Sequence, residues 1–447
     1  MHTNGIWFLI AEHSVVYSEM NLTSLFGLLG GLLVLAFGAN RLFRWTRIPD
    51  VVVLMATGVI IGPVLGWARP DQFKDVTHAF GTLALILILF EGGLDLNIRE
   101  TISHFPGGLL FGVMAYGLTT ISAGVIASAS LGISRQDGML AGAVIGCTSS
   151  TIVLPVLQQW RAEKAVKIIL LLESTLGDIL GVLTVGYLLR SHEAGGSAVG
   201  DFLTGFFSQV AISLVASLLI GFGWSRLLPY LSEQQFWQVL TFSMVLLVYA
   251  GTERLGGSGL LAVLGFGLAL SNLSGGRRSF APTLFQLSQG GAGAHEQILN
   301  FHAELSFLVR TFFFVLIGVV VELSGLRPIW PVLMGVTGVI FLARWVSIQL
   351  CRWTWRGLGS SDREKILWML PRGLITIVLA IEIVEVRGQS MAFLPAMSFA
   401  VILLTNLILV FGSIRTNKMD STETPKTAEF AENSEALPPP VSGAPSD

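Results

Sequence analysis

The sequence has few charged residues for its length. Only 13% of its 447 residues are charged, 52% are hydrophobic, and the mean hydropathy is +0.71. Soluble domains usually carry about 25% charged residues. So little charge excludes a soluble globular protein and indicates a polytopic membrane protein. A net charge of −2 gives no basic surplus for nucleic acid.

Cysteine is scarce, and histidine is missing from the interior of the apolar segments. Cys147 and Cys351 lie in separate segments, so they form neither a disulfide framework nor a metal-ligand cluster. The seven histidines lie in the N-terminal segment, in predicted loops or near predicted span ends: His2, His13, His78, His104, His192, His295 and His302. No Gly-x-Ser-x-Gly elbow is present. An intramembrane hydrolase would need a nucleophile and a base, so we expect no enzyme and no cofactor.

The two ends of the chain lack other features. Residues 1–21 have no basic region before a short apolar run, which argues against a cleaved signal peptide. We expect them to form an extracytoplasmic segment. Residues 416–447 are rich in Pro, Ser, Thr and Glu and poor in apolar residues, which predicts a disordered cytoplasmic tail.

Between the ends, apolar segments dominate. A helix needs roughly 20 apolar residues to cross the hydrocarbon core. We predict about thirteen membrane helices, at approximately 22–43, 50–67, 77–97, 105–131, 137–160, 168–189, 202–225, 236–253, 257–272, 303–324, 329–351, 366–385 and 391–414. The fold class is therefore an all-α membrane protein with one transmembrane domain over residues 22–415.

Basic residues indicate the orientation of these helices. With thirteen spans, the odd-numbered loops hold fourteen Lys and Arg residues and the even-numbered loops hold seven. Because cytoplasmic loops carry an excess of Lys and Arg, we predict an outside N-terminus and a cytoplasmic C-terminus. His295 and His302 then fall on the cytoplasmic side, either as ordinary surface histidines or as pH sensors.

The sixth segment holds a carboxylate near its centre. Asp178 is the eleventh of the 22 residues in 168–189, with Ser174 four residues and Thr175 three residues before it on the same helix face. A carboxylate flanked by hydroxyls is a hard oxygen site suited to a small cation or a proton. We predict that Asp178 binds the ion or proton; the alternative is a buried Asp that is merely protonated or hydrogen-bonded.

A second carboxylate in this segment faces elsewhere. Glu173 lies five residues earlier, about 140° around the helix from Asp178. Arg344, in the eleventh segment, is at a similar depth. Because each charge needs a partner in lipid, we predict a structural Glu173–Arg344 ion pair.

The fifth segment contains signals of helix interruption. In GCTSSTIVLPVL, the hydroxyl residues Thr148, Ser149 and Ser150 lie near the midplane and Pro155 follows. Proline removes a helix hydrogen bond. Interrupted helices mark substrate sites in transporters because helix ends and freed carbonyls face the ion. We predict a broken helix whose hydroxyls belong to the ion site, against the alternative of a kinked but continuous helix.

The twelfth segment contains matching signals. In MLPRGLIT, Pro371 and Gly373 flank Arg372. This pair favours a break, and a positive group there would offset the negative helix ends. Glu91 and Asp95, near the inner end of the third segment, are candidate partners for Arg372 or for Arg310.

These motifs together resemble the monovalent cation/proton antiporters of bacteria over nearly all of residues 20–415. FEGGLDL is similar to the motif that ends the family's third helix, and ESTLGD, with Glu173 and Asp178, is similar to the NhaP-type Glu-Ser-x-x-Asn-Asp. Arg344 falls where the family has the arginine that pairs with that Glu. The resemblance implies an inverted-repeat fold with thirteen helices, two broken helices crossing near the midplane, an elevator-like core and a homodimer.

The sequence departs from the NhaP pattern at two positions. Gly177 stands in place of Asn, and Ser149 stands in place of the Asp of a Thr-Asp-Pro sequence. TSSTIV is more similar to the Ser-Ser-Thr stretch of Kef-type potassium efflux systems, so the choice between Na⁺ and K⁺ stays open.

The sequence thus predicts an antiporter of the bacterial plasma membrane. It would exchange Na⁺ or K⁺ for H⁺, electroneutrally because Asp178 is the one clear titrating group, with membrane lipid and a second copy of the chain as partners. The alternative is a proton-coupled anion or organic-solute carrier on the same fold.

Overall fold

The computed structural model describes residues 22–46, 48–68, 74–95, 98–160, 163–193, 199–273, 291–321, 325–355 and 358–434. Within these ranges the protein is helical and has no β-strand. The helices are α2 (Leu22–Thr46), α3 (Asp50–Val59), the π-helix η2 (Ile60–Val64), α4 (Lys74–Asp95), α5 (Ile98–Leu131), α6 (Arg135–Gly146), α7 (Ser150–Gln159), α8 (Lys164–Glu193), α9 (Val199–Leu231), α10 (Trp237–Arg254), α11 (Gly259–Leu273), α12 (Gly291–Val320), α13 (Leu326–Cys351), α14 (Ser360–Trp368), α15 (Leu374–Arg387), the 3₁₀ helix η6 (Gly388–Met391) and α16 (Leu394–Ser434).

Six helices contain an apolar stretch long enough to cross a membrane. These stretches are Pro106–Leu131, Ala165–Arg190, Thr204–Leu231, Gln297–Val320, Leu326–Cys351 and Leu394–Thr416. Four shorter apolar helices are Leu29–Leu42, Asp50–Val64, Ala79–Leu94 and Gly259–Leu273. The all-α membrane class is confirmed, whereas the number thirteen stays a prediction because several predicted spans are short or divided in two.

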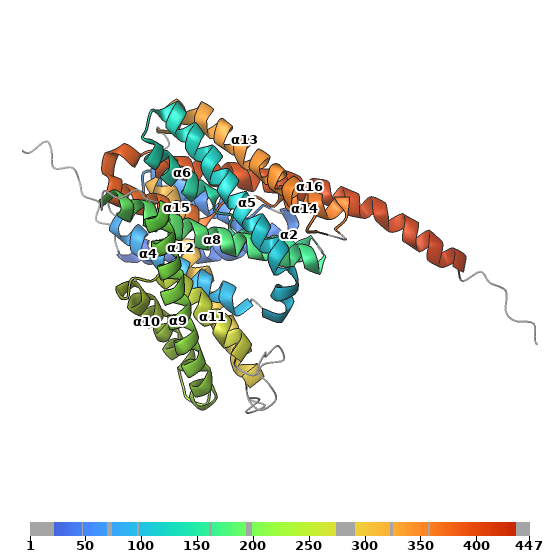
Figure 1. Ribbon diagram of the computed structural model, residues 1–447, viewed down its shortest axis with the longest axis horizontal. Helices are drawn as coiled ribbons and strands as arrows, with labels where there is room; N and C mark the ends of the chain where they lie inside the picture. The colour runs from blue at the N-terminus through green and yellow to red at the C-terminus, as the bar shows by residue number, and fades with distance from the viewer. Residues whose placement is uncertain are drawn as a thin grey trace, which may run out of the picture.

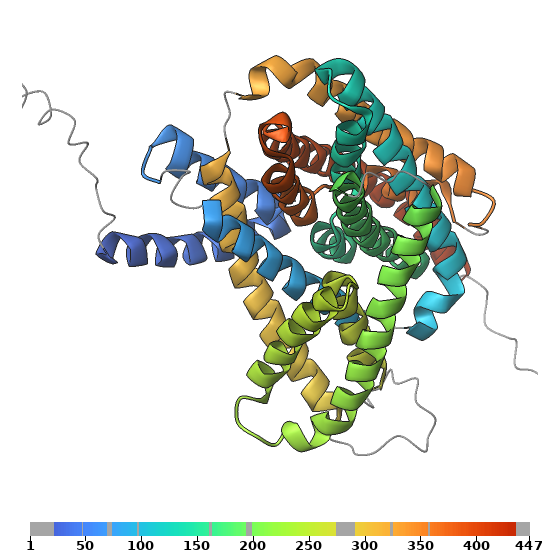
Figure 2. The same cartoon turned by 60° about the vertical axis from the view of Figure 1, so that its left-hand side comes forward.

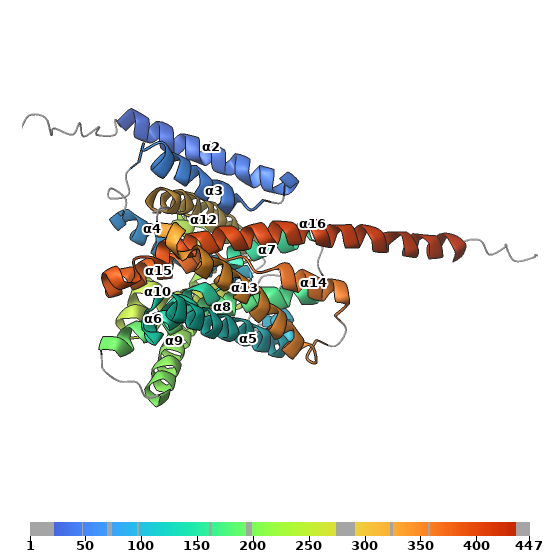
Figure 3. The same cartoon turned by 90° about the horizontal axis from the view of Figure 1, so that it is seen from above.

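The helices pack in two groups. In the first, which we call the bundle, α5 packs against α6, α8 and α13, and α15 packs against α6, α8 and α16. In the second, which we call the platform, α11 packs against α4, α9 and α10, while α12 packs against α3 and α4 (Figures 1 and 3). Helix α4 also contacts α15, so it joins the two groups. Figure 2 shows the orange-to-red α15 and α16 beside the green helices of the bundle.

Small residues bring backbones together in the platform. A Cβ atom added to Gly58 of α3 would lie 2.8 Å from the Cα atom of Gly318 in α12. Only glycine fits at such a distance, so this pair lets two helices touch along their backbones, as small residues do in membranes.

Two predicted spans are interrupted in the bundle. The fifth is divided into α6 and α7, and Cys147 and Ser149 between them have extended backbone. The twelfth is divided into α14 and α15, with non-helical residues 369–373 between them. The interruptions cross, because the backbone N–H of Ser149 donates a hydrogen bond to the carbonyl of Pro371 at 2.9 Å.

The position of the first interruption differs from the prediction. Pro155, which we expected to mark it, lies inside α7, six residues or more beyond the extended stretch 147–149. Hydroxyl side chains compete with the backbone for hydrogen bonds, and here the hydroxyl of Thr148 and the backbone N–H of Ser149 form hydrogen bonds across the crossing. Tertiary contacts therefore determine the position of the break.

The C-terminal region also needs a correction. We expected disorder from Thr416, but α16 continues to Ser434 and extends away from the body of the protein (Figures 1 and 3). A helix that is already nucleated extends without a second nucleation cost, and this region contains Ala, Glu and Lys, which favour helix. Residues 435–447 of the predicted tail and the segment 1–21 lie outside the described residues.

Candidate functional site

The crossing of the two interruptions is held by a third helix. Thr405 and Asn406 of α16 are fully buried. The backbone N–H of Arg372 donates to Thr405 Oγ1 at 3.1 Å, and Asn406 Nδ2 donates to the carbonyl of Arg372 at 3.0 Å. These contacts satisfy backbone groups that the broken helix leaves free. We did not predict this role, although two adjacent polar residues in the apolar sequence LLTNLILV were a visible signal.

Asp178 lies beside the crossing and is only 2% exposed. Ser150 Oγ, at the start of α7, donates to Asp178 Oδ2 at 3.0 Å. The other oxygen, Oδ1, has no hydrogen-bond partner among the described residues, and the same holds for Thr376 Oγ1 of α15. One carboxylate oxygen and one hydroxyl therefore remain available to a ligand.

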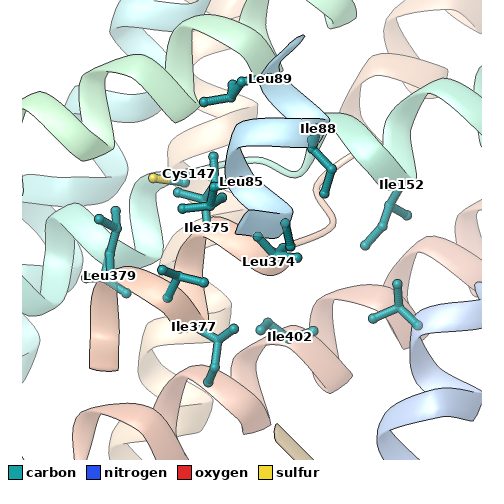
Figure 4. Packing of buried hydrophobic residues seen from close by; sticks show 14 of the residues in the cluster. Leu85, Ile88, Leu89, Cys147, Ile152, Leu374, Ile375, Ile377, Leu379 and Ile402 are labelled. Atoms are coloured by element: carbon teal, nitrogen blue, oxygen red, sulfur yellow. The ribbon is translucent and has the colours of Figure 1, made fainter. Parts of the chain in front are cut away.

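Asp178 and Thr376 line the same small cavity. Its volume is about 10 Å³, about the space that one water molecule needs. Ser149 and Ser150 also line it, and apolar side chains close it, including Leu85 of α4 and Leu374 of α15 (Figure 4). The cavity thus combines a few oxygen ligands with walls that exclude bulk water.

Glu173, one and a half turns away on α8, is fully paired. Arg344 Nη1 and Nη2 donate to Glu173 Oε1 and Oε2 at 3.0 and 3.2 Å, and both side chains are buried. Arg344 Nε also donates to the carbonyl of Ile366 in α14 at 2.7 Å. This bidentate pair connects α8, α13 and α14.

Thr148 joins this ion pair to the second interruption. Its hydroxyl donates to Glu173 Oε1 at 2.7 Å and accepts from Arg372 Nη1 at 2.7 Å. The two arginines therefore share Glu173, directly in one case and through a hydroxyl in the other. The buried charges next to the cavity form one connected network.

The predicted hydroxyl face of α8 does not provide the contact to Asp178. Ser174 Oγ donates to the carbonyl of Leu171 at 3.1 Å, as serines inside helices commonly do. Thr175 is buried. Ser150, at the start of α7, instead donates the hydrogen bond to Asp178, and Thr376 of α15 lines the same cavity, so the two interrupted helices supply the hydroxyls of the site.

Two other candidates have different surroundings from those expected. Arg310 pairs with Asp50 of α3 at 3.1 Å, and the side chain of Asp95, one of the partners expected for it, lies outside the described residues. His302 is fully buried, not on the surface, and its ring lies 4.7 Å from that of Phe90. The side chain of His295 lies outside the described residues.

A second cavity lies further along α8, between the bundle and the platform. Its volume is about 250 Å³, and it is lined by Val182, Gly186 and Arg190 of α8 together with Glu253 and Glu382 of α10 and α15. Val182 lies four residues after Asp178 and so on nearly the same face of α8, whereas Gly186 and Arg190 are rotated from Asp178 by about 80° and 120°. The larger cavity therefore approaches the Asp178 face of α8 at Val182.

The described fold agrees with comparisons to known proteins. Residues 31–415 match the family described as "Sodium/hydrogen exchanger, transmembrane". This chain belongs to the sodium/hydrogen exchanger family. It is similar to the K(+)/H(+) antiporter NhaP2 of Shewanella oneidensis, with 28% identity over 342 residues that cover 75% of this chain and 56% of that protein. The exchanger-family chain thus spans little more than half the length of that relative.

Two further comparisons cover a larger share of the compared protein. The Na(+)/H(+) antiporter 1 of Methanocaldococcus jannaschii is 27% identical over 376 residues, which cover 81% of this chain and 84% of that protein. The solved structure of the sodium proton antiporter MjNhaP1 from the same organism at pH 8 matches with a TM-score of 0.70 and 23% identity, covering 88% of this chain and 96% of that chain. The exchanger-family chain therefore has the antiporter fold.

Proposed function

We propose that this protein exchanges a monovalent cation, Na⁺ or K⁺, for protons across a membrane. The observation that carries the proposal is the environment of Asp178. Its Oδ1 atom is buried, has no hydrogen-bond partner among the described residues, and lines a cavity of about 10 Å³ together with Thr376. The family and the names of the relatives agree with this activity.

The chemistry of exchange follows from competition at one carboxylate. An ionised carboxylate behind apolar walls needs a compensating positive charge. A proton on Asp178 provides it, and so does a dehydrated monovalent cation held by Asp178, Ser150 and Thr376. Since the two occupants use the same oxygens, each must leave before the other binds. Lower pH should therefore raise the cation concentration that half-saturates transport.

We propose that one proton is exchanged for one cation. Glu173 accepts hydrogen bonds from Nη1 and Nη2 of Arg344, so we assign it to the structural ion pair and not to proton exchange. Gly177 has no ionisable side chain, and the facing interruption contributes hydroxyls and the Cys147 thiol but no carboxylate. One carboxylate that alternates between a proton and a monovalent cation moves no net charge.

Transport also needs access from both sides. The 250 Å³ cavity, which approaches the Asp178 face of α8 at Val182, is lined by Arg190 and by the carboxylates Glu253 and Glu382, and the two carboxylates attract cations. We propose it as one access route, opened and closed when the bundle moves against the platform in an elevator-like way. We further propose a homodimer in a bacterial plasma membrane, with the N-terminus outside and the C-terminus in the cytoplasm.

The small volume of the cavity beside Asp178 argues against the alternative function, a carrier of anions or organic solutes. A volume of about 10 Å³ is far below the roughly 300–1,000 Å³ of pockets for small organic ligands. A carboxylate beside it would also repel an anion. An organic solute or an anion would therefore need a different site.

Ion-resolved exchange in proteoliposomes tests the proposal. An imposed pH gradient should collapse on addition of Na⁺ or K⁺ chloride. It should not collapse on addition of choline chloride, or of an organic anion added as its choline salt. Li⁺ belongs in the same series because its size tests the fit. The proposal is wrong if no monovalent metal cation collapses the gradient in vesicles whose protein is shown to be folded, or if choline works equally well.

A further inference from the structure

A third cavity, also with charged walls, lies apart from the Asp178 site. It has a volume of about 400 Å³ and lies between α13, α14 and α16. Among the described residues that line it are three arginines and one acidic side chain: Arg352, Arg363, Arg415 and Glu364. Pockets for small ligands measure roughly 300–1,000 Å³, so this one has room for a single polar headgroup.

The charge in this cavity is not balanced. Glu364 Oε1 accepts from Arg415 Nε at 2.6 Å and from Trp368 Nε1 at 3.3 Å, so it is committed to those two donors. Arg352 and Arg363 form no ion pair with another residue in the described part of the chain. The surplus positive charge is complementary to an anion, and planar guanidinium groups match phosphate oxygens in particular.

The neighbouring surface places this cavity at the edge of the membrane. Along α13, Leu342 and Trp345 are 55% and 47% exposed and are followed, after about two turns, by the exposed Arg352. On α16, Phe411 is 68% exposed one turn before Arg415. Exposed apolar side chains on membrane helices face acyl chains, and tryptophan concentrates at headgroup level. The arginines thus lie where a row of lipid-facing side chains ends.

The lining has an apolar part next to the charged part. Trp345, Ile348 and Leu367 line the same cavity as Arg352 and Arg363. A free phosphate ion would use the arginines only, whereas a phospholipid would use both surfaces. We propose that this cavity binds the phosphate headgroup of an anionic phospholipid, with Arg352 and Arg363 as its main ligands.

The position of α14 gives such binding a structural consequence. α14 carries Arg363 into the cavity and ends at Trp368, directly before the interruption that contains Arg372. The carbonyl of Ile366, on the same helix, accepts a hydrogen bond from Arg344. A headgroup bound between α13 and α14 would therefore brace the helix that leads into the Asp178 site. Binding itself does not depend on whether the protein exchanges cations for protons.

Lipid binding to the full chain in detergent tests the assignment. Native mass spectrometry would titrate delipidated protein with phosphatidylglycerol, with phosphatidylcholine of the same acyl chains, and with inorganic phosphate. We expect tighter binding of phosphatidylglycerol than of the other two. The double variant Arg352→Gln/Arg363→Gln should bind it about 30-fold more weakly, and each single variant about fivefold more weakly.

Arg226 provides the matched control. It is an exposed arginine on α9 that lies over the ring of Phe222, away from the cavity, so Arg226→Gln should bind phosphatidylglycerol like the wild type. The melting temperature of each variant in detergent without lipid monitors folding. If the double variant melts at a lower temperature than the wild type, the lipid affinities of the two single variants test the proposal. Equal phosphatidylglycerol affinity in wild type and variants would overturn the proposal, and so would inorganic phosphate that binds as tightly as the lipid.

Discussion

Two buried carboxylates on one helix, five residues apart, have opposite surroundings. Glu173 receives two hydrogen bonds from Arg344 and one from Thr148. Asp178 receives one from Ser150 and keeps Oδ1 without a partner among the described residues. Both side chains are 2% exposed, so burial does not distinguish them. Their partners do: we assign Glu173 to structure and Asp178 to transport.

The largest expected effect is on transport by an Asp178 variant. Asp178→Asn removes the charge that a cation needs and the group that a proton occupies, so exchange should fall below detection. Stability should not fall, because no ionic partner is lost. The measurements are pH-gradient collapse in proteoliposomes and melting in detergent. Asp137→Asn, at a pair with Arg387 away from the cavity, is the matched control. Normal exchange by Asp178→Asn would contradict the assignment.

Glu173 should show the reverse pattern. Glu173→Gln leaves Arg344 buried without its anion, which should lower the free energy of unfolding by about 3–5 kcal/mol. The double variant Glu173→Met/Arg344→Met should recover part of that loss, since Arg344 is no longer buried without its anion, while Arg372 still loses the carboxylate that it shares through Thr148. Denaturant titration in detergent measures both.

An exposed ion pair serves as the control for Glu173. Arg415 and Glu364 are 66% and 20% exposed, so Glu364→Gln should cost less than about 1 kcal/mol. If Glu173→Gln is no more destabilising than Glu364→Gln, the buried pair is not a structural lock.

A smaller effect distinguishes the two serines near Asp178. Ser150→Ala removes a hydrogen bond to the carboxylate, and hydrogen bonds to charged groups contribute about 1.5–3 kcal/mol. The cation concentration that half-saturates exchange should therefore rise by about tenfold or more. Ser174→Ala should leave it unchanged, because that hydroxyl bonds to Leu171. A larger effect at Ser174 than at Ser150 would favour the helix-face prediction over the crossing contact.

The smallest expected effect is that of voltage, which should be zero. The membrane potential contributes about 2.3 kcal/mol per charge per 100 mV, but one-for-one exchange moves no net charge. The exchange rate should not change when voltage is clamped with an ionophore pair that excludes the substrate cation. A current on a solid-supported membrane would show that exchange moves net charge, which contradicts the one-for-one stoichiometry.

The sequence was sufficient for features that depend on one residue and its depth. The membrane class follows from composition. The contact between Glu173 and Arg344 follows from two opposite charges at matching depth in apolar segments. It was insufficient where contacts join distant segments. Ser150 and Thr376 reach the Asp178 cavity, and Asn406 holds the carbonyl of Arg372, because two interruptions cross. Helical spacing favoured Ser174 instead, since periodicity reports neighbours on one helix and not across helices.

Cys147 provides a chemical probe of how often the closed cavity opens. Its thiol is 1% exposed and lines the space next to Asp178, and the other cysteine of the chain, Cys351, can be replaced. A thiol reacts through its thiolate and only where reagent and water reach it. In a Cys351→Ser background, the rate of alkylation by a small permeant reagent would therefore report how often the site opens. A saturating substrate cation, by occupying the cavity, should slow that reaction, so the frequency of opening can be measured without following transport.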